Sequence, residues 1–454
     1  MAAVPKIVYR EKAILLFGDI FVLLASLWLT IAVRRLTIPS TADFLDFTSS
    51  FSVIFIVWII VFFISGMYEA QTLLTKSRVP RIVISTQTIN VIAAVVFFYL
   101  FSEFQKFGIT PKTNLLIYCV ISTSLIVAWR LFLYDKISGS KRTSAILISS
   151  GDEMRELKDE VNGNNRYPFH FNTVIDLDSE ADCLKLREIT KSGADEYGVI
   201  VLDVSHQSAS PILSDFYSLM FLGEGKTCIE FVKLYEEIFR RIPLSSLNHQ
   251  WLLQNMTITR KTIYDIIKRI MDLVLSGVLS IPFFIIYPFV ALAIKLEDKG
   301  EVLIAQDRVG EHGQLIRLLK FRSMTGNEDG KWVSEGTVRV TKVGMFLRKS
   351  RIDELPQLIA VFKGDISLIG PRPDIKGLSD RLREEIPYYE VRTIVKPGLS
   401  GWAQITQEGR PPQTVDETKL RLSYDFYYIK HRSAWLDLAI ALKTIKTLIM
   451  RVGV

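Results

Sequence analysis

Residues 271–296 read MDLVLSGVLSIPFFIIYPFVALAIKL, a run that is apolar and long enough to cross a bilayer. Basic residues flank it on both sides, among them Lys268 before it and Lys299 after it, which indicates that both ends face the cytoplasm. Pro282 removes a backbone donor and bends the helix, and a hydroxyl such as that of Ser280 can satisfy a freed carbonyl. A helix that enters the membrane and returns on the same face fits both observations. A straight span kinked at the proline is the alternative.

Four earlier runs have the length and apolarity of spanning helices, at about residues 13–33, 51–67, 82–101 and 115–133. The chain has 454 residues, 49% of them hydrophobic, so part of it should lie in lipid. Its net charge of +7 suits anionic lipid or nucleic acid equally, and the apolar runs favour the membrane. Basic residues cluster before the first run, after the second and after the fourth. We therefore expect the amino terminus and everything after the fourth run to face the cytoplasm.

Short apolar runs alternate with amphipathic ones between residues 141 and 255, which is the pattern of βαβ units. Helices are expected to start near Asp152 and Ser179, giving a parallel sheet of Rossmann type. The first turn, residues 149–153, reads SSGDE rather than GxGxxG, so we favour a structural or regulatory domain over a cofactor site. Three cysteines and five histidines are too scattered for a disulfide framework or a zinc site. The expected strands are 145–149, 173–175, 197–202 and 227–231.

Two adjacent carboxylates, Asp353 and Glu354, lie among arginines in the run RKSRIDELPQL. Adjacent acids on a helix are usually solvated. Here Arg348 and Arg351 are close in sequence, and a carboxylate near cationic groups stays ionised at neutral pH. Such a group suits either a nucleophile or a metal ligand.

Basic residues in the last third are placed to bind phosphate. Arg372 lies between two prolines, which fix its backbone and reduce the entropy lost when it grips an anion. Lys320 and Arg322 alternate with an apolar residue, as on a strand that presents both cations to one face. Arg410 follows a glycine, and Asp425 lies in an aromatic run that suits a membrane interface or a buried core. A rigid turn and a polar strand face are the alternatives without a function.

Together these motifs resemble the bacterial sugar transferases, that is the monotopic phosphoglycosyl transferases, over about residues 260–454. In chain order the motifs are KRIMDLVLSG, QDRVG, KFRSM, RKSRIDELPQL, GDISLIGPRP, KPGLSGWAQI and YDFYYI. The whole chain looks like the long form, the undecaprenyl-phosphate hexose-1-phosphate transferases that begin O-antigen, capsule or exopolysaccharide assembly. The resemblance implies a membrane α-helical bundle of four spans (1–140) and a Rossmann-like α/β domain (141–255). It also implies an α/β catalytic domain (256–454) with a re-entrant membrane helix.

The resemblance also implies roles for individual residues. Asp353 falls on the family nucleophile, which attacks the β-phosphate of a UDP-hexose, and Glu354 falls on the Mg²⁺ ligand. UMP leaves, and undecaprenyl phosphate then takes the phosphosugar from the aspartate. The break of the re-entrant helix falls on Pro282 with Ser280, although Ile281 stands where the family usually has a serine. Expected substrate or phosphate contacts are Lys320, Arg322, Arg348, Arg351, Arg372, Arg410 and Asp425.

The same resemblance predicts a multi-pass protein of the bacterial inner membrane with its catalytic domain on the cytoplasmic face. Its expected partners are a UDP-hexose, undecaprenyl phosphate, membrane lipid and a second copy of the chain, with no nucleic acid. A non-catalytic scaffold or regulator of polysaccharide assembly is one alternative, and the intact Asp353–Glu354 pair argues against it. A glycosyl transferase that moves only the sugar is another, and it would release UDP. Glucose and galactose are the leading candidates for the sugar.

Overall fold

The computed structural model describes residues 4–65, 67–68, 79–100, 111–138, 142–164, 167–191, 196–206, 227–256, 262–297, 299–325, 339–407 and 412–450. The chain forms two compact units, Met1–Leu234 and Tyr235–Val454. The predicted division into three regions stays a prediction.

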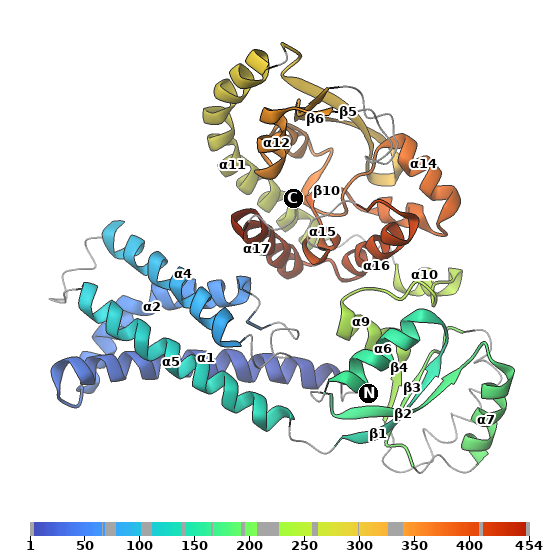
Figure 1. Cartoon of the computed structure of the whole chain (residues 1–454), viewed down its shortest axis with the longest axis horizontal. Helices are drawn as coiled ribbons and strands as arrows, with labels where there is room; N and C mark the ends of the chain where they lie inside the picture. The colour runs from blue at the N-terminus through green and yellow to red at the C-terminus, as the bar shows by residue number, and fades with distance from the viewer. Residues whose placement is uncertain are drawn as a thin grey trace. The chain divides into compact units, whose positions relative to one another are not determined.

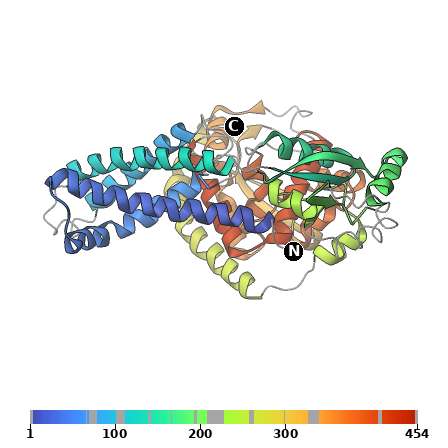
Figure 2. The same ribbon diagram turned by 90° about the horizontal axis from the view of Figure 1, so that it is seen from below.

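Four helices form a bundle in the first unit: α1 (Val4–Arg35), α2 (Thr41–Ile64), α4 (Val79–Leu100) and α5 (Pro111–Ser138). Figures 1 and 2 show them gathered side by side. Their centre is aromatic, with Trp58 and Tyr118 fully buried. In α1 and α5 the stretches Ile14–Arg35 and Leu115–Phe132 are long and apolar enough to cross a membrane. The apolar stretches of α2 and α4 are shorter, so the prediction of helices is confirmed for all four and that of four spans is not.

A four-stranded parallel sheet follows, in the order β2-β1-β3-β4 (Figure 1). The predicted strands and helix starts are confirmed to within a few residues. Asp152 and Glu153 occupy the first turn of α6, and their negative charge opposes phosphate binding at that helix end. That the domain is of Rossmann type stays a prediction. The elements are β1 (Thr143–Ser149), α6 (Gly151–Gly163), β2 (Phe169–Asp176), α7 (Glu180–Lys191), β3 (Val199–Leu202), β4 (Thr227–Glu230) and α9 (Phe231–Phe239), the last of which runs into the second unit.

The second unit combines helices with short sheets (Figure 1). Strands β5 and β6 pair antiparallel, and β9 and β10 pair parallel although 28 residues separate Ile369 from Gly398 in the numbering. Its elements are α10 (His249–Asn255), α11 (Thr262–Glu297), β5 (Leu303–Val309), η3 (Glu311–Gly313), β6 (Leu315–Phe321), β7 (Met324–Thr325), β8 (Arg339–Val340), α12 (Lys342–Lys349), η5 (Ile352–Gln357), α13 (Leu358–Lys363), β9 (Ser367–Ile369), α14 (Lys376–Glu385), η6 (Tyr389–Ile394), β10 (Gly398–Ser400), α15 (Trp402–Thr406), α16 (Val415–His431) and α17 (Ala434–Met450).

Helix α11 contains the apolar run and continues through Pro282 and Pro288. It is the third helix long and apolar enough to cross a membrane in the part of the chain described. In Figure 1 its ribbon changes direction along its length. The hydroxyl of Ser280 donates to the carbonyl of Ser276 at 2.8 Å, whereas the carbonyl that Pro282 leaves without its helical donor is that of Val278, so the expected role of Ser280 at the break stays a prediction. That α11 re-enters the membrane stays a prediction.

Candidate active site

A left-handed turn presents the two adjacent carboxylates. Helix α12 ends at Lys349, and Arg351 then adopts φ 58° and ψ 15°, a conformation that costs a side-chain-bearing residue energy. The turn redirects the chain into η5, which carries Asp353 and Glu354 in its first turn. Pro356, which is buried, continues that element towards α13. Leu358, which is 2% exposed, anchors the end of this segment in the core.

Asp353 is a buried carboxylate with an unusual charge environment. Its side chain is 8% exposed, and its Oδ1 has no hydrogen-bond partner among the residues that the structure describes. Burial raises the pKa of Asp353 to about 6, and the neighbouring Glu354 adds to this rise. Lys320, Arg372 and Arg348 oppose it. At neutral pH the group is therefore ionised yet poorly solvated, which is the state of an activated nucleophile.

Glu354 has the opposite environment. Its Oε1 lies 2.5 Å from Nη2 of Arg372 and its Oε2 lies 3.4 Å from Nη1, so the guanidinium binds both oxygens. Arg351 lies 3.9 Å away. Burial is the largest influence and opposes ionisation, but Arg372, Arg351 and Lys320 together outweigh it and lower the pKa of Glu354 to about 2. Glu354 thus carries its negative charge throughout the physiological pH range.

The segment that carries Arg372 has little room to move. A Cβ on Gly370 would lie 2.6 Å from the carbonyl oxygen of Lys396, and one on Gly398 would lie 2.1 Å from the amide nitrogen of Gly370. The two glycines are therefore required by the close approach of the strands β9 and β10. This contact brings the segment of Arg372 and the segment of Gly398 together.

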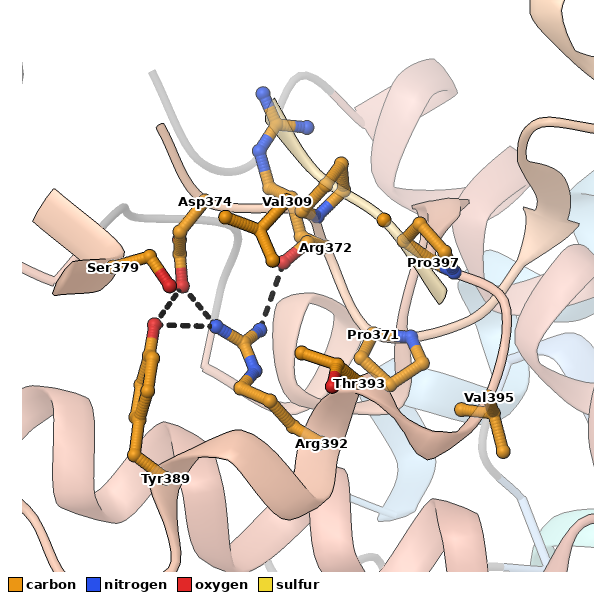
Figure 3. Close-up of a pocket in the computed structure, with 12 residues that line it drawn as sticks. Val309, Pro371, Arg372, Asp374, Ser379, Tyr389, Arg392, Thr393, Val395 and Pro397 are labelled. Carbon is orange, nitrogen blue, oxygen red and sulfur yellow. Dashed lines mark hydrogen bonds and ion pairs between the residues drawn. The ribbon is translucent and has the colours of Figure 1, made fainter. Parts of the chain in front are cut away.

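A buried network of ion pairs and hydrogen bonds holds the backbone of Arg372 on the side opposite its guanidinium. Its carbonyl oxygen accepts hydrogen bonds from Nη2 of Arg392 at 2.8 Å and from Nη2 of Arg421 at 2.6 Å. Both arginines pair with Asp374, and Arg392 also pairs with Asp425 at 2.8 Å. In Figure 3 the guanidinium of Arg372 points away from this network, while Arg392 and Asp374 face each other within it. Two acids and two arginines balance in charge, which is the condition for burying them.

The other predicted residues lie in four different settings. Lys320 on β6 and Arg348 in the last turn of α12 both act on the charge of Asp353, as Arg372 does. Arg322 follows β6, and its guanidinium lies against Gly300, where an added Cβ would come within 2.6 Å. Asp425 is 1% exposed and lies in the network, so its expected contact with substrate stays a prediction. Arg410 lies outside the described residues.

Sequence reasoning missed Arg392, Arg421 and Asp374. Arginines that are 6% exposed, as Arg392 and Arg421 are, carry no periodic signal that distinguishes them from solvated ones. Asp374 comes two residues after Arg372, directly after Pro373, and this position is the only signal of it in the sequence.

The carboxylates fit Mg²⁺, which proteins bind with one or two carboxylates and complete with substrate phosphates and water. Asp353 and Glu354 are adjacent, and the Oδ1 of Asp353 has no partner among the described residues. No group of three or more His, Cys, Asp or Glu side chains that would hold a metal occurs in the described part of the chain. The described carboxylates therefore supply only part of the coordination that Mg²⁺ needs.

Comparison with known proteins identifies the family. The family model described as bacterial sugar transferase matches residues 263–451. The chain is 41% identical over 188 residues to a UDP-glucose:undecaprenyl-phosphate glucose-1-phosphate transferase from Caulobacter vibrioides, covering 41% of this chain and 70% of that protein. It therefore belongs to the bacterial sugar transferases, as its motifs indicate, and it is an enzyme.

Two other relatives match this chain over a longer stretch than the first, and their names give different sugars. A UDP-N-acetylgalactosamine-undecaprenyl-phosphate N-acetylgalactosaminephosphotransferase from Aeromonas hydrophila is 37% identical over 277 residues, which are 60% of this chain and 64% of that protein. An undecaprenyl-phosphate galactose phosphotransferase from Salmonella typhimurium is 34% identical over 211 residues, 42% of this chain and 41% of that protein. The match to the Aeromonas hydrophila protein is longer than the stretch of residues 263–451 that the family model matches.

Proposed function

We propose that the enzyme transfers a hexose-1-phosphate from a UDP-hexose to undecaprenyl phosphate and releases UMP, the first membrane step of O-antigen, capsule or exopolysaccharide synthesis. The observation that carries the proposal is Asp353, a buried carboxylate with an unpartnered oxygen and a pKa near 6, whose charge is offset by Lys320, Arg348 and Arg372. A carboxylate that is ionised but poorly solvated is a suitable nucleophile toward phosphorus. The names of the three relatives support undecaprenyl phosphate as the acceptor, and two of the names also support a UDP-sugar as the donor.

The reaction proceeds in two displacements at one phosphorus atom. An oxygen of Asp353 bonds to the β-phosphorus of the UDP-hexose, and the bond to the bridging oxygen breaks, so that UMP leaves with the electron pair. An oxygen of undecaprenyl phosphate then bonds to the same phosphorus, which returns Asp353 to its carboxylate form and gives undecaprenyl-diphosphate hexose. Lys320, Arg348 and Arg372 offset the negative charge of the transferring oxygens. One carboxylate thus serves a soluble donor and a lipid acceptor that need not be bound together.

Magnesium would be held by Glu354, with Asp353 beside it, and would supply positive charge at the phosphate oxygens. The protein's own contribution at Glu354 is the ion pair with Arg372, which keeps the Glu354 carboxylate ionised and the Arg372 guanidinium oriented.

A re-entrant α11 on the cytoplasmic face of the inner membrane completes the proposal. Contacts with the catalytic unit recur along the helix: Phe283 and Tyr287 pack on Phe321 with ring centroids 6.1 and 5.7 Å apart. At the far end, the Glu297 carboxylate accepts hydrogen bonds from the backbone of Lys342 and Val343 at 2.7 and 2.9 Å. A helix tied to one unit at Phe283, at Tyr287 and at Glu297 is better suited to enter and return than to cross. The polyprenyl tail then stays in lipid while its phosphate reaches Asp353.

The decisive experiment measures which nucleotide is released. The purified protein is given undecaprenyl phosphate, Mg²⁺ and a panel of UDP-sugars, and UMP and UDP are quantified with the lipid product. Asp353→Asn is compared with Asp380→Asn, which neutralises an exposed carboxyl on α14. UMP release that is lost only in Asp353→Asn supports the proposal and names the sugar. UDP release supports transfer of the sugar alone, and no release with any donor supports the scaffold.

Omitting the lipid acceptor tests the two-step route. We expect about one UMP per enzyme under these conditions and a mass increase of one hexose phosphate on the peptide that contains Asp353. UMP formation that requires undecaprenyl phosphate in the first turnover would instead indicate direct transfer. The proposed homodimer is tested separately, by the mass of the protein in lipid nanodiscs.

A further inference from the structure

Three charged residues near the start of α11 have no part in the chemistry above. Lys268, Arg269 and Asp272 belong to the motif KRIMDLVLSG, in which only the apolar residues suit a membrane. Lys268 and Asp272 are one helical turn apart and so lie on the same face. Charged groups on an apolar helix are costly unless they are bonded, so their partners indicate what they do.

Lys268 and Asp272 bind strand β9. The Nζ of Lys268 donates to the carbonyl oxygen of Ile369 at 2.8 Å and pairs with Asp437 at 2.9 Å. The Oδ1 of Asp272, which is 6% exposed, accepts from the amide of Leu368 and from the hydroxyl of Ser367, both at 3.0 Å. Side chains of the helix thereby form hydrogen bonds with a backbone carbonyl and a backbone amide of β9, as the backbone of a neighbouring strand would.

Strand β9 leads directly into the Arg372 segment. Ile369 is followed by Gly370, which packs so closely against the backbone of Lys396 that an added Cβ would lie 2.6 Å from its carbonyl oxygen. We therefore expect a displacement of Ile369 to move Arg372 as well, and Arg372 in turn holds Glu354.

Arg269 binds the other half of the site. Its Nη1 and Nη2 donate to the carbonyl oxygens of Val361 and Phe362, each at 2.7 Å. These are carbonyls in the last turn of α13, where a cation also complements the helix dipole. Helix α13 follows without a break from η5, the element that carries Asp353.

We propose that Lys268, Arg269 and Asp272 are positioning residues that clamp the Asp353 segment and the Arg372 segment to one apolar helix. The inference rests on the proposed function, because it assigns the clamp to the spacing between the nucleophile and a phosphate-binding guanidinium. Since the reacting groups come from two segments that meet on α11, the helix fixes their spacing as well as holding the enzyme in lipid. Misplacement of reacting groups by about 1 Å costs roughly a hundredfold in rate.

The test combines kinetics with amide hydrogen exchange in the full-length protein. Lys268→Met and Asp272→Leu are expected to lower kcat for UMP release by roughly ten- to a hundredfold, with a smaller change in KM for the UDP-sugar. Asp272→Asn keeps an acceptor oxygen and is expected to retain most of the activity. Lys295→Met removes the same charge from an exposed position of the same helix and is the matched control. It should behave as the native protein does.

Exchange reports on the clamp without reference to activity. Lys268→Met should raise exchange in residues 366–374, and Arg269→Gln should raise it in residues 358–364, with residues 342–349 unchanged. Unchanged exchange in both segments, or equal effects of Lys295→Met, would overturn the clamp. If the native protein transfers no phosphosugar, the proposed function is wrong. The exchange data would still show in that case whether the clamp exists.

Discussion

Asp353→Asn should make the protein more stable at neutral pH while it abolishes transfer. The substitution keeps the size of the side chain and removes its charge. Burial and the adjacent Glu354 raise the pKa of Asp353 from 3.8 to about 6, a difference of about 2.2. At 1.36 kcal/mol for each tenfold change, the ionised carboxylate costs the native state about 3 kcal/mol.

The sign of this cost sets its pH dependence. Because the pKa of Asp353 is raised on folding, the native state binds its proton more tightly than the unfolded chain does. The cost is complete above about pH 6 and vanishes below the unfolded value of 3.8. The advantage of Asp353→Asn should therefore be about 3 kcal/mol at pH 8 and about half of that at pH 5.

Thermal unfolding in detergent micelles measures this advantage. For a unit of this size, 1 kcal/mol shifts the midpoint by roughly 2–4 °C, so Asp353→Asn should melt several degrees higher at pH 8. Asp380→Asn, on an exposed part of α14, is the control and should melt as the native protein does. An Asp353→Asn protein that melts at or below the native midpoint at pH 8, or whose advantage does not shrink at pH 5, would refute the reasoning.

Three further outcomes are expected. The rate of UMP release should fall as the pH drops through about 6, since Asp353 must be unprotonated to attack, and a pH profile of kcat/KM from 5 to 8 measures this. Arg372→Lys keeps the charge but loses the two-point binding of Glu354 and, in the proposed mechanism, of phosphate, so it should lower kcat/KM roughly a hundredfold in the same assay; equal activity would contradict this role of the guanidinium. Arg392→Met should lower stability by about 3–5 kcal/mol in thermal or denaturant unfolding, because it leaves part of the Asp374 and Asp425 charge buried without a partner.

The elements of the fold could be predicted where a local pattern of apolar and turn-forming residues marks them. Strand β1 and the start of α6 follow from a short apolar run and a turn, and the structure places both where the pattern does. The apolar runs were likewise sufficient to predict α1 and α5. Patterning could not show that β9 pairs with β10, since that pairing depends on Gly370 and Gly398 allowing two backbones to approach.

The site was predictable only as a set of candidate residues. The adjacent acids and the proline-flanked arginine predicted Asp353, Glu354 and Arg372 as site residues, and the structure brings these three together. The other residues of the site are distinguished by their burial, and the sequence does not indicate which arginines are buried. Arg392 therefore gave no signal, although it holds the carbonyl of Arg372. The same is true of Lys268, which reads as a flanking charge and in fact binds β9.

The contrast between Asp353 and Glu354 shows how neighbouring carboxylates acquire different roles. Both are surrounded by the same cations, yet Arg372 bonds to Glu354 and leaves an oxygen of Asp353 without a partner. The paired acid has its pKa lowered to about 2, and the unpaired one has its pKa raised to about 6. Two groups whose pKa values are driven apart in this way suit different tasks, one a fixed charge and the other a reactive base or nucleophile. The direction of the Arg372 guanidinium is thus what makes Asp353, rather than Glu354, the group suited to attack phosphorus.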